Sequence, residues 1–324
     1  MHTLEKTRYG AYWGRRAVYN LFRKFNCPEA TMQTCQDMIG REEDGVLTAI
    51  SGLVAGVKGS TCGVVSGGAL GLGLMHADEL QRDGVGTEAG VMALASDYVK
   101  GFDQTYGTTL CSERTNVDFW TLRGLLRYLM PGHRMVPCMI HIHGSLKRLC
   151  EMQEVDLPQI AVDNEVNNIH CARDVLKGIR ERTGVGDPVL EKISMVLDGG
   201  VAYSGGLCGA LAGAVLAIHL LLGDNLREIS LPRSYYIFLK GLTYLRAEEE
   251  QDCDHSYNGT RKMALPFEES AGSINCREIT GRDFSGWDDF QSHIRSADRC
   301  RELIEFSISH ACQILEEFDS INRD

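Results

Sequence analysis

The sequence predicts an all-α protein made of two homologous helical domains related by a pseudo-two-fold axis. Three observations carry this prediction. Apolar residues recur at three-and-four spacing, long alternating runs typical of strands are absent, and five cysteines recur in the same order in both halves. The chain has 324 residues, 44% of them hydrophobic and 24% charged, which is enough for two ordinary domains with real cores.

The apolar spacing predicts helices over residues 15–25, 47–57, 89–102, 189–197, 234–245 and 297–318. Residues 135–142 are compatible with either a helix or a strand. Residues 207–222 form an uncharged apolar run of 16 residues, short of the roughly 20 needed to span a bilayer. We therefore interpret this run as a buried central helix.

The two halves align on the motif Cys-Gly-x-x-x-Gly, and the alignment extends to five cysteine pairs. These pairs are Cys27 with Cys171, Cys62 with Cys208, Cys111 with Cys276, Cys138 with Cys300, and Cys150 with Cys312. Cys35 and Cys253 have no counterpart. The alignment predicts one repeat over residues 1–153 and a second over 163–324, joined near 155–158.

Charge and cysteine content narrow the class of protein. The formal net charge is −11 and no basic block occurs, which argues against nucleic-acid partners and anionic membrane surfaces. The first residues lack the continuous apolar stretch of a signal peptide. Twelve cysteines without an export signal favour reduced, metal-binding or redox-cycling thiols, so we expect a cytoplasmic protein outside the membrane.

Several of the repeated cysteines fall where a helix is expected to begin. Asn26 and Pro28 flank Cys27, Thr61 precedes Cys62, and Asn275 precedes Cys276. Unpaired backbone N–H groups and the positive end of the helix dipole favour thiolate over thiol at such positions. The thiolate is the form that binds iron or zinc and attacks disulfides.

Glycines are expected to allow close approach of backbone in two places. Those around Cys62 and Cys208 would let backbone approach a sulfur or a cluster, and those inside the helices favour tight helix packing. The helix-packing set is Gly67, Gly71, Gly73 and Gly213.

Three cysteines are interpreted as core thiols. Cys312 follows Cys300 by twelve residues, a rotation of about 120° on a helix, so the two thiols cannot both point into one site. Cys312 and its partner Cys150 are therefore assigned to the core, as is Cys35, because free cysteine is often a small buried apolar residue.

A zinc site is not favoured. His133, Cys138, His141 and His143 lie close in sequence, but His141 and His143 face apart on a helix. The chain has no Cys-x-x-Cys pair, the local spacing that structural zinc sites normally use.

The second half combines Cys208-Gly209-Ala210-Leu211-Ala212-Gly213 with Cys-Arg-Glu-x-x-Gly beginning at Cys276, and with Cys171 upstream and Cys300 downstream. In this combination it resembles the C_GCAxxG_C_C family of redox-active proteins. Gly209 departs from the family tag, where alanine follows cysteine directly. The first half matches less well, because Cys62 is followed by Gly-Val and Cys111 by Ser-Glu-Arg, and it is the diverged copy.

The family is similar to the iron–sulfur part of split-Soret cytochromes, which implies a cluster, [2Fe–2S] or [4Fe–4S]. The implied ligands are Cys171, Cys208, Cys276 and Cys300 for one cluster and Cys27, Cys62, Cys111 and Cys138 for a second. The protein would then be an electron carrier with a redox protein as its partner, either alone or as a homo-oligomer.

Two alternatives stay open. In a thiol–disulfide oxidoreductase, Cys208 would be the nucleophile and Cys171 or Cys276 its resolving partner. In a structural subunit of a redox complex, the cysteines would be core residues.

Overall fold

The computed structural model describes residues 3–82, 84–130, 134–162, 168–224, 227, 229–236 and 256–321. Within these residues every regular element is a helix, apart from two isolated β-bridges, so the all-α prediction is confirmed. None of the described helices is both long and apolar enough to cross a membrane.

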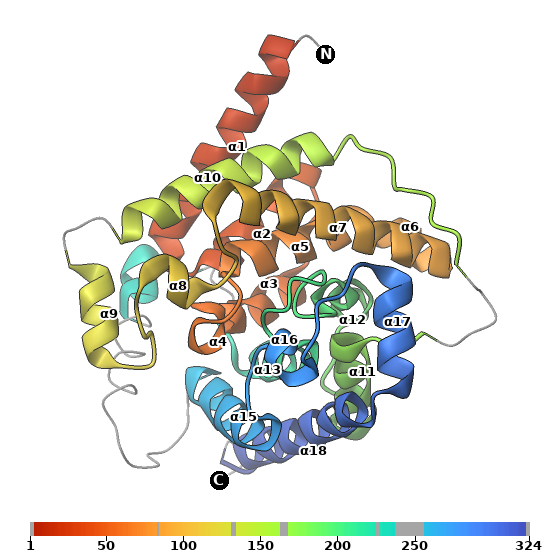
Figure 1. Ribbon diagram of the computed structural model, residues 1–324. Coiled ribbons are helices and arrows are strands. Elements are labelled where there is room, and N and C mark those ends of the chain that lie inside the picture. The colour runs from red at the N-terminus through yellow and green to blue at the C-terminus, as the bar shows by residue number, and fades with distance from the viewer. Residues whose placement is uncertain are drawn as a thin grey trace.

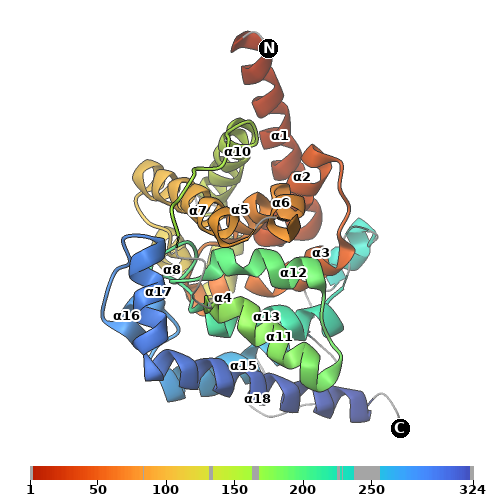
Figure 2. The ribbon, with the colours of Figure 1, turned by 90° about the vertical axis from the view of Figure 1, so that its right-hand side faces the viewer.

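The first half occupies the upper part of the molecule in Figure 1. Its elements are α1 (Thr3–Lys24), α2 (Cys27–Ile39), α3 (Asp44–Ile50), the 3₁₀ turn η1 (Ser51–Leu53), α4 (Gly56–Gly59), α5 (Gly63–Met75), α6 (Ala77–Arg82), α7 (Val85–Tyr106), α8 (Cys111–Thr115), α9 (Leu122–Leu129) and α10 (Met135–Met152). The start of α1 projects beyond the body of the molecule (Figures 1 and 2).

The second half lies below the first half in Figure 1. Its elements are α11 (Cys171–Thr183), α12 (Pro188–Ile193), the 3₁₀ turn η2 (Ser194–Leu197), α13 (Gly209–Leu222), α15 (Ser256–Ala271), α16 (Cys276–Thr280), α17 (Trp287–Ser296) and α18 (Asp298–Ile321). The aligned cysteines make α2, α5, α8 and α10 the counterparts of α11, α13, α16 and α18.

The central helices α5 and α13 pack tightly because glycine faces the neighbouring helix. A Cβ atom on Gly67 would lie 2.8 Å from the carbonyl oxygen of Pro28 in α2. In the second half, a Cβ atom on Gly213 would lie 2.7 Å from the carbonyl oxygen of Ala172 in α11. The predicted helix packing is confirmed at both positions. In each half it holds the helix that begins at the first cysteine (α2 or α11) against the helix that begins just after the second cysteine (α5 or α13).

The two halves share one core rather than meeting at a polar interface. Gly52 of η1 lies against the imidazole of His219 in α13, and a Cβ there would stand 2.6 Å from the ring. At the reciprocal contact, Gly73 of α5 lies against Ile193 of α12. The buried apolar residues of both halves accordingly form a single cluster.

Most of the predicted helices are confirmed, and one is wrong in part. The predicted helix over 47–57 ends at Ile50, because Val54 is extended and Ala55, Val57 and Lys58 have positive φ. Residues 135–142, left open between helix and strand, are helical. Of the predicted helix over 234–245, residues beyond 236 lie outside the described part of the chain.

Candidate functional site

Four cysteines of the second half line one small pocket. Cys171, Cys208 and Cys276 are buried, and Cys300 is partly exposed at the pocket's edge. Most of the remaining lining is apolar, with two polar side chains. The full set of other lining residues is Ala210, Ile279, Thr280, Phe284, Phe290, His293, Ile294 and Leu303. A group bound here would be held by sulfur and largely shielded from water by aromatic and aliphatic side chains.

Each of these four cysteines lies at the beginning of a different helix. Cys171 and Cys276 are the first residues of α11 and α16, Cys208 caps α13, and Cys300 lies in the first turn of α18. Unpaired backbone N–H groups and the positive end of a helix dipole favour an anionic sulfur at such positions. At Cys208 the backbone N–H groups of Ala210 and Leu211 act in this direction.

The first half repeats this arrangement. Cys27 and Cys111 begin α2 and α8, Cys62 caps α5, and Cys138 lies in the first turn of α10. The helix starts predicted at Cys27, Cys62 and Cys276 are confirmed, although Cys62 itself, rather than Thr61, is the capping residue.

The four thiols of the first half are close enough to affect one another's ionisation. Burial raises the pKa of the Cys111 thiol well above its usual value, and the charges of Cys62, Cys27 and Cys138 raise it further. The pKa of Cys27 is likewise raised by burial and then by Cys62 and Cys138. The structure thus brings together the four first-half cysteines that the sequence grouped.

A pair of backbone hydrogen bonds holds the second and third cysteines of each half side by side. In the second half, Cys208 N–H donates to the Ile274 carbonyl (2.8 Å) and Cys276 N–H to the Gly206 carbonyl (2.7 Å). Cys62 and Cys111 donate in the same way to Thr109 and Ser60, each at 2.7 Å. These two short bridges join loops distant in sequence, and no local pattern indicated them.

A left-handed turn precedes the second cysteine in both halves. In the first half Ala55, Gly56, Val57 and Lys58 all have positive φ. In the second half the corresponding run is Gly199, Gly200, Val201, Ala202 and Tyr203. A β-branched residue is rare in this conformation, and strain of this kind persists only where surrounding contacts enforce it. The repeated strain supports assigning function to both loops.

Burial dominates the ionisation of the Cys208 thiol. It raises the pKa to about 11, although the backbone N–H groups of Ala210 and Leu211 at the start of α13 act in the opposite direction. Cys62 behaves alike, since burial raises its pKa against the opposing effects of Arg114 and of the Val64 and Val65 N–H groups. Without a bound cation these sulfurs would carry protons at neutral pH.

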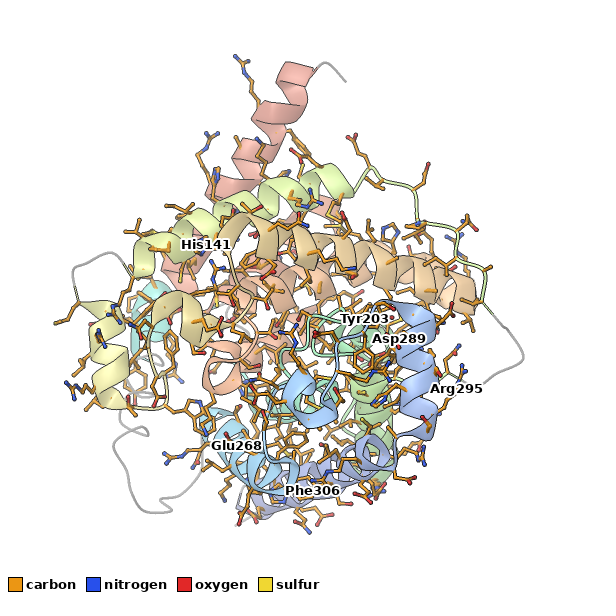
Figure 3. The ribbon with its side chains drawn as sticks, in the orientation of Figure 1. His141, Tyr203, Glu268, Asp289, Arg295 and Phe306 are labelled. Atoms are coloured by element: carbon orange, nitrogen blue, oxygen red, sulfur yellow. The ribbon has the colours of Figure 1, made fainter. Side chains whose placement is uncertain are left out.

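The two sites differ in the charged groups beside the cysteines. Arg114 follows Cys111 on α8, and its guanidinium lies 4.6 Å from the centre of the Phe102 ring and donates to the Thr108 carbonyl (2.8 Å). The equivalent residue in the second half is Ile279, which lines the pocket. His141 projects from α10 and contacts Arg114 (Figure 3). The first site therefore has a cation that the second lacks at this position.

The fourth cysteine of each half has a polar neighbour. The Tyr128 hydroxyl donates to Cys138, which lowers the thiol pKa against the larger effect of burial. In the second half, His293 Nε2 lies 3.9 Å from Cys300 Sγ. The sequence did not indicate either neighbour, because each lies on a different helix from its cysteine. Tyr128 lies on α9 and Cys138 on α10, and His293 lies on α17 and Cys300 on α18.

A buried ionic network supports the first cysteine of the second half. Asp198 accepts the backbone N–H of Cys171 at 2.8 Å with one oxygen and contacts His170 Nδ1 at 2.7 Å with the other. Glu88, from the first half, lies 3.4 Å from His170 Nε2 and accepts from Arg173 at 2.6 Å. The network fixes the start of α11 and ties the two halves together at the site.

The remaining described cysteines lie outside both groups. Cys35, Cys150 and Cys312 are buried, as predicted for core thiols, and Cys35 packs against Gly71 between α2 and α5. Cys253 and His133 lie outside the described residues.

The donor set fits an iron–sulfur cluster. Among the described residues, no three His, Cys, Asp or Glu side chains are grouped as ligands of a metal ion. In a [4Fe–4S] cluster each thiolate binds its own iron, and in a [2Fe–2S] cluster each iron takes two thiolates, so the four sulfurs surround the cluster instead of meeting at one metal. Four cysteines around one apolar pocket satisfy this requirement.

Comparison with known proteins places the chain in a family. The sequence model described as "Putative redox-active protein (C_GCAxxG_C_C)" matches twice, over residues 25–128 and 169–317. The chain belongs to this family. The second match contains all four pocket cysteines of its half, whereas the first ends before Cys138. Two matches confirm the duplication, and membership in the family supports a redox role. Neither the curated proteins nor the solved structures that were searched gave a match.

Proposed function

We propose that the protein is an electron carrier that holds one iron–sulfur cluster in each half. The observation that carries this proposal is the convergence of Cys171, Cys208, Cys276 and Cys300 on one pocket. Four thiolates supply the complete protein ligation of a [2Fe–2S] or [4Fe–4S] cluster. The first-half group of Cys27, Cys62, Cys111 and Cys138 would hold the second cluster.

The surroundings favour a cluster over a dithiol enzyme. An attacking cysteine needs a low pKa and exposure to its substrate. Cys208 has a raised pKa and is 8% exposed, and Cys171 is 7% exposed. A dithiol enzyme also needs only two cysteines, and each half brings four together. Bound iron would replace the thiol protons and offset the mutual repulsion of the thiolates.

The protein's own residues would define the chemistry of the bound group. A cluster supplies one-electron redox chemistry. The helix N-termini at the cysteines would stabilise the anionic assembly, and Phe284 and Phe290 would exclude water. Cys300 is the most exposed of the four second-half ligands, so we propose that a redox protein partner exchanges electrons with this site on the side of α18.

Iron analysis of single-cysteine variants tests the proposal. The protein would be purified without oxygen and reconstituted with ferrous iron and sulfide, and then iron, acid-labile sulfide and the absorption spectrum would be measured. We expect two clusters per chain in the wild-type protein and one cluster per chain in each of the variants Cys208→Ser and Cys62→Ser. Cys312→Ser, a buried cysteine outside both groups, is the matched control and should keep both.

The same experiment identifies the dithiol alternative. A colourless, iron-free wild-type protein with two rapidly alkylated thiols per half would overturn the cluster proposal. Loss of iron in Cys312→Ser equal to that in Cys208→Ser would show that the ligand assignment is wrong.

A further inference from the structure

The two candidate sites meet at equivalent residues of the two halves. Thr61 precedes Cys62, and its counterpart Leu207 precedes Cys208. The backbone N–H of Leu207 donates to Thr61 Oγ1 at 2.8 Å, and both residues are completely buried. The pseudo-two-fold axis therefore passes between the residues that precede the second cysteine of each site.

The loops approach so closely here that only glycine fits beside Thr61. A Cβ atom on Gly206 would lie 2.0 Å from Thr61 Oγ1. Cys62 directly follows Thr61, and Cys208 directly follows Leu207, so each cysteine is one residue removed from the same 2.8 Å hydrogen bond.

A second link joins the third cysteines of the two halves. Ser60 accepts the backbone N–H of Cys111 with its carbonyl at 2.7 Å, and its hydroxyl donates to Asn275 Oδ1 at 2.5 Å. Asn275 precedes Cys276 directly. Two hydrogen-bonded routes thus connect a cysteine of one site with a cysteine of the other.

We propose that the Thr61 and Ser60 links carry electrons between the two sites, so that the protein works as a two-site relay. The proposal rests on the proposed function, because each site must hold a redox group. Electron tunnelling falls off less steeply through bonded atoms than through empty space. The route through Thr61 consists of covalent bonds and one hydrogen bond, and the route through Ser60 of covalent bonds and two hydrogen bonds. Thr61 and Leu207 have no contact with water.

The transfer balances within the molecule. One electron leaves the reduced site, which is thereby oxidised by one electron. The same electron enters the other site, which is reduced by one electron. No bond between heavy atoms forms or breaks, and neither Thr61 nor Ser60 needs to change its protonation. The first electron comes from an external one-electron donor, which in the test is the methyl viologen radical.

Pulse radiolysis of the reconstituted protein measures the transfer. A pulse that generates less than one viologen radical per chain delivers an electron, and absorbance follows its redistribution. In wild type we expect a phase whose rate is independent of protein concentration, and Cys208→Ser should lack it because only one site remains. Thr61→Val should keep wild-type iron content and slow this phase several-fold, whereas Thr61→Ser should restore it.

Controls separate the relay from the proposed function and from misfolding. Iron and sulfide contents are measured first, so absence of clusters would refute the proposed function without a pulse. Thr34→Val removes another fully buried hydroxyl away from the links and should leave the phase unchanged.

If Thr61→Val does not fold, Ser60→Ala tests the second link with the same expectation. A wild-type protein that holds both clusters and shows no such phase would overturn the relay. An unchanged rate of this phase in a folded Thr61→Val protein would also overturn the relay. Where Ser60→Ala is used instead, an unchanged rate in that variant would do the same.

Discussion

Asp198 accepts the backbone N–H of Cys171 at 2.8 Å, and this contact joins the first cysteine of the second site to a buried imidazole. At the corresponding place in the first half stands Val54, at the end of η1. The second site is thus braced by a buried carboxylate that has no counterpart at the equivalent position of the first half.

Removal of this carboxylate should weaken the fold and the second site. Asp198→Ala would leave the Cys171 N–H and the His170 imidazole without their buried partner, and we expect a loss of about 1–3 kcal/mol in the free energy of unfolding. Asp198→Asn keeps an oxygen for the N–H and should lose less. Urea unfolding of the metal-free proteins measures both, and equal losses would contradict the assigned role.

Glu88 should make stability depend on pH in the acid range. Burial raises the pKa of this carboxyl, but the hydrogen bond to His170 and the Arg173 charge outweigh it, and the net pKa lies well below the usual value. A lowered folded-state pKa contributes stability that is present above the unfolded-state pKa, about 4.3, and is lost as the pH falls below it.

Glu88→Gln should therefore flatten the acid limb of the stability curve. The measurement is the free energy of unfolding between about pH 3 and pH 7, where the wild-type protein should lose more than the variant. Glu181→Gln, at a 60% exposed side chain in a 4.0 Å surface pair, is the control and should follow the wild type. A variant curve parallel to that of the wild type would refute the assignment.

The cysteine repeat could be predicted from the sequence, because spacing along the chain reports which residues a duplicated fold places together. Asn26 was recognised for a similar local reason, since its side chain accepts the Glu29 N–H three residues later. Asp198 and Arg114 were missed because their roles depend on contacts between loops far apart in sequence. The predicted helix over 47–57 failed for a related reason. Contacts around the first site hold Val57 in a left-handed conformation that apolar spacing cannot report.

Arg114 should raise the reduction potential of the first site. A nearby cation stabilises the added electron, and the equivalent Ile279 cannot do so. Arg114→Ile should lower the first site's potential by tens of millivolts, on the order expected for one charge near a partly screened site. A redox titration followed by electron paramagnetic resonance checks this, with Cys208→Ser as the background that leaves only the first site. Arg182→Ile, on the surface of the second half, should not shift it.

Gly200 is the position where one added methyl group should damage the second site most directly. Its φ of +80° is strained for any other residue, and a Cβ atom would lie 2.5 Å from the backbone nitrogen of Gly206. Gly206 supplies the carbonyl that holds the Cys276 N–H. Gly200→Ala should therefore cost at least about 1–2 kcal/mol in stability from the left-handed conformation alone, with the steric clash in addition.

The variant should also reduce iron binding in the second half while the first half keeps its cluster. The control is Gly84→Ala, because that glycine has a negative φ and open space around it. Urea unfolding and iron analysis measure the two effects. A Gly200→Ala protein with wild-type stability and iron content would show that the left-handed turn does not position Cys208 and Cys276.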